Sequence, residues 1–67
     1  MDFKMNKYKY NLIINSIIFD EHKQEKDVFD LLVRGYTIIE IGNILGMCER
    51  TVYRRKKELK KKLLSLF

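Results

Sequence analysis

Residues 37–55, TIIEIGNILGMCERTVYRR, carry the signals for two helices separated by a short turn. Thr37 and Glu40 form a capping box, in which each side chain can bond the backbone amide of the other residue and start a helix. Gly46 permits the left-handed backbone that often ends a helix. A second helix then begins at Glu49, whose negative charge suits a helix N-terminus. The stretch therefore predicts a helix-turn-helix.

The apolar positions around this turn fit two helices that pack against each other. Gly42 lies inside the first helix, where glycine costs roughly 1 kcal/mol relative to alanine, so we expect Val52 to pack closely over it. The first helix should bury Ile38, Ile41, Ile44 and Leu45. The second should bury Val52, Leu59, Leu63 and Leu66, with the aliphatic stems of Arg55 and Lys56 between the first two. The wedge between the helices should consist of Ile41, Leu45, Met47 and Val52.

Two further helices are predicted before this stretch. Asp20 can cap a helix over residues 21–34, and Gly35 can end that helix. Its buried face is expected to consist of Val28, Leu31 and Leu32, flanked by Phe29 and Val33. Within residues 1–20, the spacing of one helical face holds for Tyr10, Ile13, Ile14, Ile17 and Ile18. Isoleucine also favours strands, but a lone strand would have no sheet to join, so we predict a helix.

Together these patterns predict a small all-α bundle of about four helices that contains a helix-turn-helix. We expect the 67 residues to form one domain. It would consist of an N-terminal helix within residues 1–20, which could serve dimerisation, a helix-turn-helix core over residues 21–63, and an apolar end at residues 64–67. A hydrophobic content of 46% without proline fits a folded helical bundle better than a disordered chain.

Positive charge is concentrated in the last third of the chain. Residues 47–67 contain eight Lys and Arg side chains against Glu49 and Glu58, whereas residues 25–46 have a net negative charge. Such a basic segment favours a polyanionic partner, because Lys and Arg near a duplex release its condensed counterions. The lysines at positions 60–62 would equally suit the negative end of a helix dipole, so charge alone does not separate the two explanations.

The sequence argues against several other classes of protein. It contains no His/Asp/Ser or Cys/His constellation, no phosphate-binding glycine loop and no cluster of metal ligands, so we expect no enzyme, no cofactor and no metal site. Cys48 is the single cysteine, so an internal disulfide is impossible. The apolar run at residues 12–19 is shorter than the about 20 residues that cross a bilayer and lacks a signal cleavage site. A soluble, cytoplasmic protein without a membrane partner is the expectation.

Residues 25–63 resemble the GerE/LuxR-type DNA-binding domain and are also similar to region four of bacterial sigma factors. The resembling segments are EKDVFDLLVRGYTIIEIGNILGM and CERTVYRRKKELKKKL. The family's acidic-apolar helix, glycine, EI-A-x-x-L helix and TV opening are matched by Glu25–Val33, Gly35, Glu40-Ile41-Gly42, Leu45 and Thr51-Val52. The match covers more than half of the chain and keeps its spacing over three helices. It implies a sequence-specific transcriptional regulator of double-stranded DNA, bacterial or phage, that reads the major groove with a helix over residues 49–63.

The resemblance also implies which residues contact DNA. The family's base-reading positions fall on Arg50, Tyr53, Arg54 and Lys57, and its phosphate contacts on Thr37, Thr51 and Lys61 or Lys62. Helical periodicity supports the first set independently, because those positions lie opposite Val52 and Leu59. Arg50 or Arg54 could donate two hydrogen bonds to guanine O6 and N7, worth about 1–3 kcal/mol of discrimination. The alternative for this set is a solvated helix face.

Three departures from the family bear on this prediction. Arg55 stands where the family often has His or an apolar residue, which leaves the orientation of its side chain open. Cys48 stands where the family usually has Ser or Thr as N-cap, which predicts a weakly capped recognition helix. The dimerising fourth helix of the GerE/LuxR type is not found after Leu63, which is more similar to the sigma arrangement or to short regulators of phages and mobile elements. A homodimer is still expected, because two half-sites about 10 base pairs apart raise affinity. Its interface is predicted to include Ile13, Ile17, Leu63, Leu66 and Phe67.

Two alternatives stay open at this point. The chain could be a sigma-like or adaptor module that docks on RNA polymerase or another protein partner, with its basic helix touching DNA only within that assembly. Several aromatic side chains could also stack on single-stranded bases, although core packing explains them more simply. These aromatic residues are Tyr8, Tyr10, Phe19, Phe29 and Tyr36.

Overall fold

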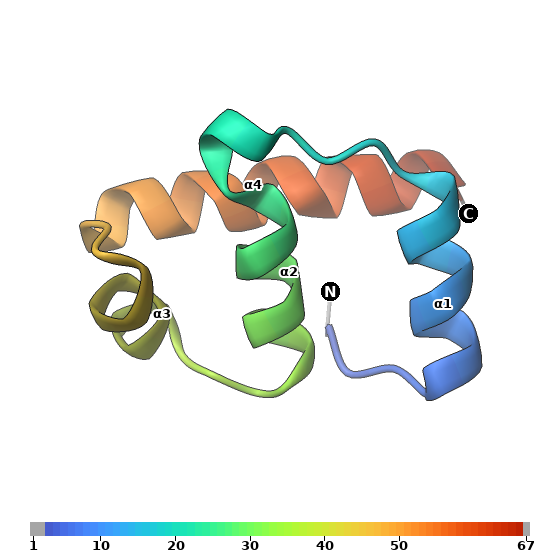
Figure 1. Ribbon diagram of the computed structural model, residues 1–67, viewed down its shortest axis with the longest axis horizontal. Coiled ribbons are helices and arrows are strands. Elements are labelled where there is room, and N and C mark those ends of the chain that lie inside the picture. Colours follow the sequence, from blue (N-terminus) through green and yellow to red (C-terminus); the bar gives the residue numbers. More distant parts are fainter. Residues whose placement is uncertain (1–2, 67) are drawn as a thin grey trace.

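The computed structural model, which describes residues 3–66, is a bundle of four helices built along one long helix (Figure 1). Its elements are α1 (Lys7–Ser16), a short 3-10 turn η1 (Glu21–Lys23), α2 (Glu25–Val33), α3 (Ile38–Leu45) and α4 (Glu49–Leu66). Both α2 and α3 pack against α4, and α1 stands at the end of the molecule where α4 finishes (Figure 1). The prediction of an all-α bundle is confirmed, as is the choice of helix over strand near the N-terminus.

The helix-turn-helix forms as the local sequence signals predict. The Thr37 amide donates to Glu40 Oε1 at 3.0 Å, and the Glu40 amide donates to Thr37 Oγ1 at 3.2 Å. The hydrogen bond from the Thr37 amide also lowers the pKa of Glu40, because it stabilises the carboxylate. Gly46 ends α3 with a φ of 69°, in the left-handed region. The capping box and the glycine stop therefore fix both ends of α3.

Gly42 is required by the close return of the chain after α3. A Cβ atom at this position would lie 2.6 Å from the carbonyl oxygen of Met47 and 3.7 Å from Val52 Cγ2. The expected closeness to Val52 is present, but the turn itself approaches more tightly than the second helix. The Met47 amide donates to the Gly42 carbonyl at 2.9 Å, which holds the turn against the end of α3.

The hydrophobic core lies between α4 and the three other helices. Most of the predicted core positions of α4 are confirmed, because Val52, Leu59 and Leu63 are fully buried. Arg55 and Lys56 are half-buried beside them, as expected for side chains whose stems continue the apolar stripe. Within residues 3–66, the buried hydrophobic side chains are Phe3, Ile13, Val28, Phe29, Leu32, Ile41, Val52, Leu59 and Leu63.

Phe29 is the contact point between α2 and the N-terminal part of the chain. Its ring packs edge-on against Phe3 with 6.3 Å between centroids, stacks on Tyr10 at 5.7 Å and meets Phe19 at 5.6 Å. The Tyr10 hydroxyl donates a short hydrogen bond to Asp30, which raises the pKa of Tyr10. These rings serve the core, so the base-stacking alternative is left only with Tyr8 and Tyr36, which are exposed.

The predicted helix over residues 21–34 is wrong in its first turn. Asp20 does act as a cap, because its side chain accepts from the His22 amide, but it caps η1 rather than a long helix. Gln24 then adopts a left-handed conformation with a φ of 53°, and α2 starts only at Glu25. The Asp20 amide donates to Glu25 Oε1 at 2.7 Å, so the interruption brings the Glu25 carboxylate back onto the preceding turn.

Some side chains predicted to be buried are exposed. Ile44 lies on the outer side of α3, and Leu66 lies in the last turn of α4. Ile18, predicted to share a helical face with Ile13, instead follows the end of α1 and is exposed. Leu31 is only half-buried, whereas its neighbour Phe29 is fully buried. The two turns of α3 have more apolar positions than they bury, so the helical spacing overestimates the buried face of this short helix.

The predicted dimer interface is also wrong in part. Ile13 and Leu63 are buried inside the single chain, so neither is on the surface for a second chain to contact. Ile17 is half-buried against the core, and Leu66 is exposed. Phe67 lies outside the described residues. Packing within one chain buries Ile13 and Leu63, because α1 lies across the end of α4.

Candidate nucleic-acid interface

The solvent side of α4 carries a continuous row of basic side chains. Arg50, Arg54, Lys57 and Lys61 are separated by four, three and four positions, which places them on one side of the helix, and all four are exposed. The buried positions Val52, Leu59 and Leu63 lie on the opposite side. We call these four residues the basic face. The structure thus brings four of the seven predicted DNA-binding residues into one exposed row.

Tyr53 and Lys60 border the basic face. The Tyr53 side chain is 59% exposed, so its ring and hydroxyl point into solvent rather than into the core. A shallow hollow runs along this part of α4, with Tyr53 at one end and Leu64 at the other. Its remaining lining residues are Lys56, Lys57, Lys60 and Lys61. Lys60 was not among the predicted contacts, although its position, seven residues after Tyr53, would have indicated a shared side of the helix.

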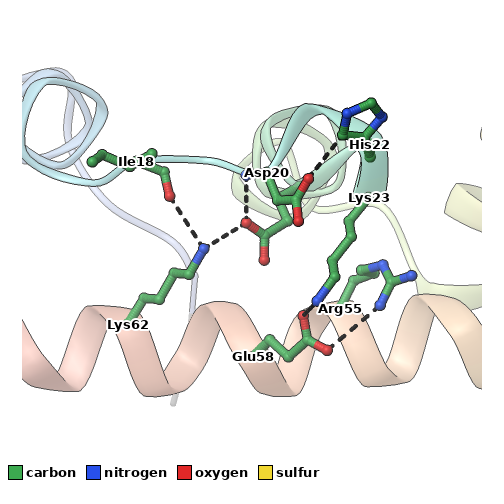
Figure 2. A network of polar contacts seen from close by, with 8 residues as sticks. Ile18, Asp20, His22, Lys23, Arg55, Glu58 and Lys62 are labelled. Carbon is green, nitrogen blue, oxygen red and sulfur yellow. Dashed lines mark hydrogen bonds and ion pairs between the residues drawn. The ribbon is translucent and has the colours of Figure 1, made fainter.

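A second edge of α4, turned towards the segment before α2, carries charges that are all paired (Figure 2). We call Arg55, Glu58 and Lys62 the paired edge. Arg55 and Glu58 lie 3.5 Å apart, Glu58 and Lys23 of η1 lie 3.7 Å apart, and Lys62 lies 2.5 Å from Glu25 of α2. Within residues 3–66, none of the ion pairs includes a side chain of the basic face. The charges of α4 are therefore divided between two edges with different environments.

The ion pair between Lys62 and Glu25 anchors the second half of α4. Besides accepting from Lys62, the Glu25 carboxylate accepts from the Asp20 amide, and the Lys62 ammonium also donates to the Ile18 carbonyl at 3.2 Å (Figure 2). The Glu25 side chain is only 2% exposed, and burial alone would raise its pKa. The hydrogen bonds from Lys62 and Asp20 outweigh burial and lower the pKa of Glu25. Lys62, the alternative to Lys61 as a phosphate contact, is thus occupied inside the protein.

Arg55 lies beside the basic face in sequence but belongs to the paired edge. Its side chain is largely buried, and its Nη1 atom is 3.5 Å from Glu58 Oε1. The Nε atom is buried without a hydrogen-bond partner. Arg55, whose orientation the comparison with the family left open, therefore faces the paired edge and is not available to a groove of DNA.

The start of α4 is held by Cys48 and Thr51. Cys48 Sγ lies 3.1 Å from Thr51 Oγ1, and the Cys48 carbonyl accepts from the Val52 amide at 3.1 Å. The side chain and amide of Thr51 lower the pKa of the Cys48 thiol, because both can stabilise a thiolate at the helix N-terminus. Cys48 therefore contacts the first turn of α4 through both its sulfur and its carbonyl oxygen. Thr51 is half-buried, and its hydroxyl is already in this local contact.

Thr37 lies at the start of α3 and is exposed. Its hydroxyl oxygen accepts from the Glu40 amide, and the hydroxyl hydrogen can still be donated, for example to a phosphate oxygen. The remaining predicted phosphate contact, Lys61, belongs to the basic face. Neither residue is therefore excluded by its surroundings.

The chain matches no protein-family model, no curated protein and no solved structure. The described residues contain no group of three His, Cys, Asp or Glu side chains that could hold a metal ion. Across residues 3–66, no helix has both the length and the apolar character needed to cross a membrane. The assignment of a function therefore depends on the geometry and charge of α4.

Proposed function

We propose that the protein binds double-stranded DNA in a sequence-specific manner, with the basic face of α4 lying in a major groove. The observation that carries this proposal is a row of four exposed cations on the second helix of a helix-turn-helix, none of which forms an ion pair with another residue of the described range 3–66. A helix that only needed solubility would gain from alternating charges. A row of only positive charges instead favours binding to a polyanion such as DNA, because each contact with a phosphate releases condensed counterions.

The length of the basic face fits a groove and its borders. From Arg50 to Lys61 the row extends about 16 Å, at about 1.5 Å per residue. A major groove is about 12 Å wide, so the first part of the row can lie against base edges while its end reaches the phosphate backbone. We assign base reading to Arg50, Arg54 and Lys57, and a phosphate contact to Lys61.

Tyr53 adds a contact of a different kind. Its exposed ring stands beside Arg54 and Lys57 on the solvent side of α4. The ring edge can pack on a thymine methyl group, and the hydroxyl can donate to a phosphate oxygen. Two-sided contacts of this type help fix the depth at which a helix enters the groove. A role in transcriptional regulation, by a homodimer on two half-sites, is the biological function that we infer from such binding.

Neighbouring arginines provide the test. DNA selected from a random pool should contain a preferred sequence, and Arg54→Ala should weaken binding to it about 10- to 100-fold, as expected for loss of a bidentate contact with guanine. Arg55→Ala is the matched control, because it removes the same charge from the paired edge, and it should change affinity less than about threefold. Fluorescence anisotropy with circular dichroism as a folding check measures both. Equal losses in the two variants, or no enrichment from the pool, would contradict the proposal.

An adaptor function is favoured by a separate observation on α3. Ile39 and Ile44 are each more than half exposed on this short helix, and large exposed apolar side chains are available for contact with a protein partner. A sigma-like module docking on RNA polymerase would use such a surface. It predicts weak, uniform retention of all fragments in a gel shift across a salt series, whereas sequence-specific binding predicts discrete retained fragments.

A further inference from the structure

The outer side of α1 is an exposed surface that the proposed DNA contact does not use. Tyr8 is 78% exposed and Leu12 is 47% exposed, one helical turn apart, with the uncharged side chains Asn11 and Asn15 next to them. The opposite side of the same helix packs inward through Ile13, which is fully buried. α1 therefore has apolar side chains on both of its sides, and no part of the chain within residues 3–66 covers Tyr8 and Leu12 on the outer side.

The charges of α1 are arranged against its own dipole. The first turn contains no acidic residue but has Lys7, and the last turn contains no basic residue. The positive end of a helix dipole disfavours lysine, and the last carbonyl groups of a helix have no partner within it. A second helix running antiparallel alongside would bring its negative end next to Lys7. If the second helix is another copy of α1, Lys7 of each copy lies next to the negative end of the other copy's helix, because a twofold axis makes the two contacts equivalent.

The position of α1 in the molecule also favours a second copy. α1 forms one end of the long axis, which measures 29 Å, and α4 begins at the other end (Figure 1). Two chains that met through α1 would keep the strongly basic starts of their α4 helices apart and leave both basic faces uncovered. We propose that the outer side of α1 is a self-association surface, on which two copies pair antiparallel with Leu12 close to the twofold axis.

The size of this surface indicates a weak pair. A helix of 10 residues is about 15 Å long, so two such helices bury less than the about 1,200 Å² of a stable interface. Pairing should therefore be strongest when two chains are held side by side, which raises their effective concentration. This last step rests on the proposed function, since adjacent half-sites on DNA would hold the chains in that way. The pairing of α1 itself does not rest on it.

Cross-linking of the free protein tests the surface directly. In a Cys48→Ser background, Leu12→Cys places the only thiol near the expected axis, and Ile39→Cys on α3 is the control at a similarly exposed apolar position. With diamide as oxidant and several hundred micromolar protein, we expect Leu12→Cys to form covalent dimers at least tenfold faster. Equal rates for the two variants would overturn the proposal.

Binding to paired sites supplies the second measurement. Leu12→Glu changes an exposed side chain and should leave the helical circular dichroism intact. It should abolish cooperative binding to DNA with two half-sites while leaving the affinity for one half-site unchanged. Cooperativity that survives Leu12→Glu would refute self-association through α1. If the wild-type protein bound no DNA at all while Leu12→Cys still cross-linked, the proposed function would fail and the α1 surface would stand.

Discussion

Arg54 and Arg55 are adjacent in the chain and identical in type, as are Lys61 and Lys62, yet each pair is divided between two environments. Arg54 and Lys61 extend into solvent on the basic face, whereas Arg55 and Lys62 turn towards carboxylates on the paired edge. One position along a helix is a rotation of about 100°, so neighbouring cations can serve different purposes. The comparison teaches that the excess charge of α4 is not uniform. One part stabilises the fold, and the other part is available to a partner.

The largest effect should come from the buried end of the paired edge. Glu25→Leu removes the acceptor of both Lys62 and the Asp20 amide. It should cost about 1–3 kcal/mol, because the amide loses its partner while Lys62, about one-third exposed, can still reach water. Arg54→Ala on the basic face should change the free energy of unfolding by less than about 0.5 kcal/mol. Urea unfolding followed by circular dichroism measures both. Glu25→Gln, which keeps the shape, should lie between them; similar values for all three would mean that the two edges do not differ.

The pH dependence of stability should trace to the same carboxylate. Because its folded pKa is lowered, Glu25 contributes stability above its unfolded pKa, about 4.3, and loses this contribution as the pH falls through the folded value. The difference in unfolding free energy between the wild type and Glu25→Gln should be constant near neutral pH and shrink below about pH 4.3. Urea midpoints from pH 7 to pH 3 give this difference. If the difference in unfolding free energy instead grew as the pH fell, the folded pKa of Glu25 would be raised rather than lowered.

The two neighbouring lysines should differ in the salt dependence of DNA binding. Lys61→Ala removes one phosphate contact. The negative slope of log K against log salt should therefore become shallower by about 0.9. Lys62→Met removes the same charge from the paired edge and should leave the slope unchanged, although it lowers stability. Anisotropy titrations at several salt concentrations, at a temperature where both variants are folded, separate the two. If both variants had a slope equally shallower than that of the wild type, both lysines would lie near DNA. If neither slope changed, Lys61 would not contact a phosphate.

The smallest effect is expected at the exposed end of the paired edge. Glu58 lies 3.5 Å from Arg55 and 3.7 Å from Lys23, but its own side chain is about one-third exposed. Ion pairs reached by water contribute about 0–1 kcal/mol and weaken with salt. Glu58→Gln should therefore lower the free energy of unfolding by less than about 1 kcal/mol, and less in 1 M salt than in 0.1 M. A larger, salt-independent loss would mean that this pair is as well buried as Glu25 and Lys62.

Local signals in the sequence predict the helix-turn-helix well. The capping box of Thr37 and Glu40, the stop at Gly46 and the buried positions of α4 each depend on residues within one or two turns of one another. The same periodicity predicts the basic face, because a helix with a known buried side has a known exposed side. Predictions fail where a short helix has more apolar positions than it can bury, as at Ile44, or where Gln24 interrupts a helical pattern.

The sequence by itself determined that the chain is helical, where the helix-turn-helix lies and which side of α4 is basic, because these depend on short-range hydrogen bonding and periodicity. Only the tertiary structure decided which charges of α4 are paired. Glu25 and Lys62 are 37 positions apart, and their contact requires η1, the left-handed Gln24 and the docking of Phe29 against the N-terminal segment. The division between Lys61 and Lys62 is therefore a property of packing, since the local sequence around two adjacent lysines cannot distinguish them.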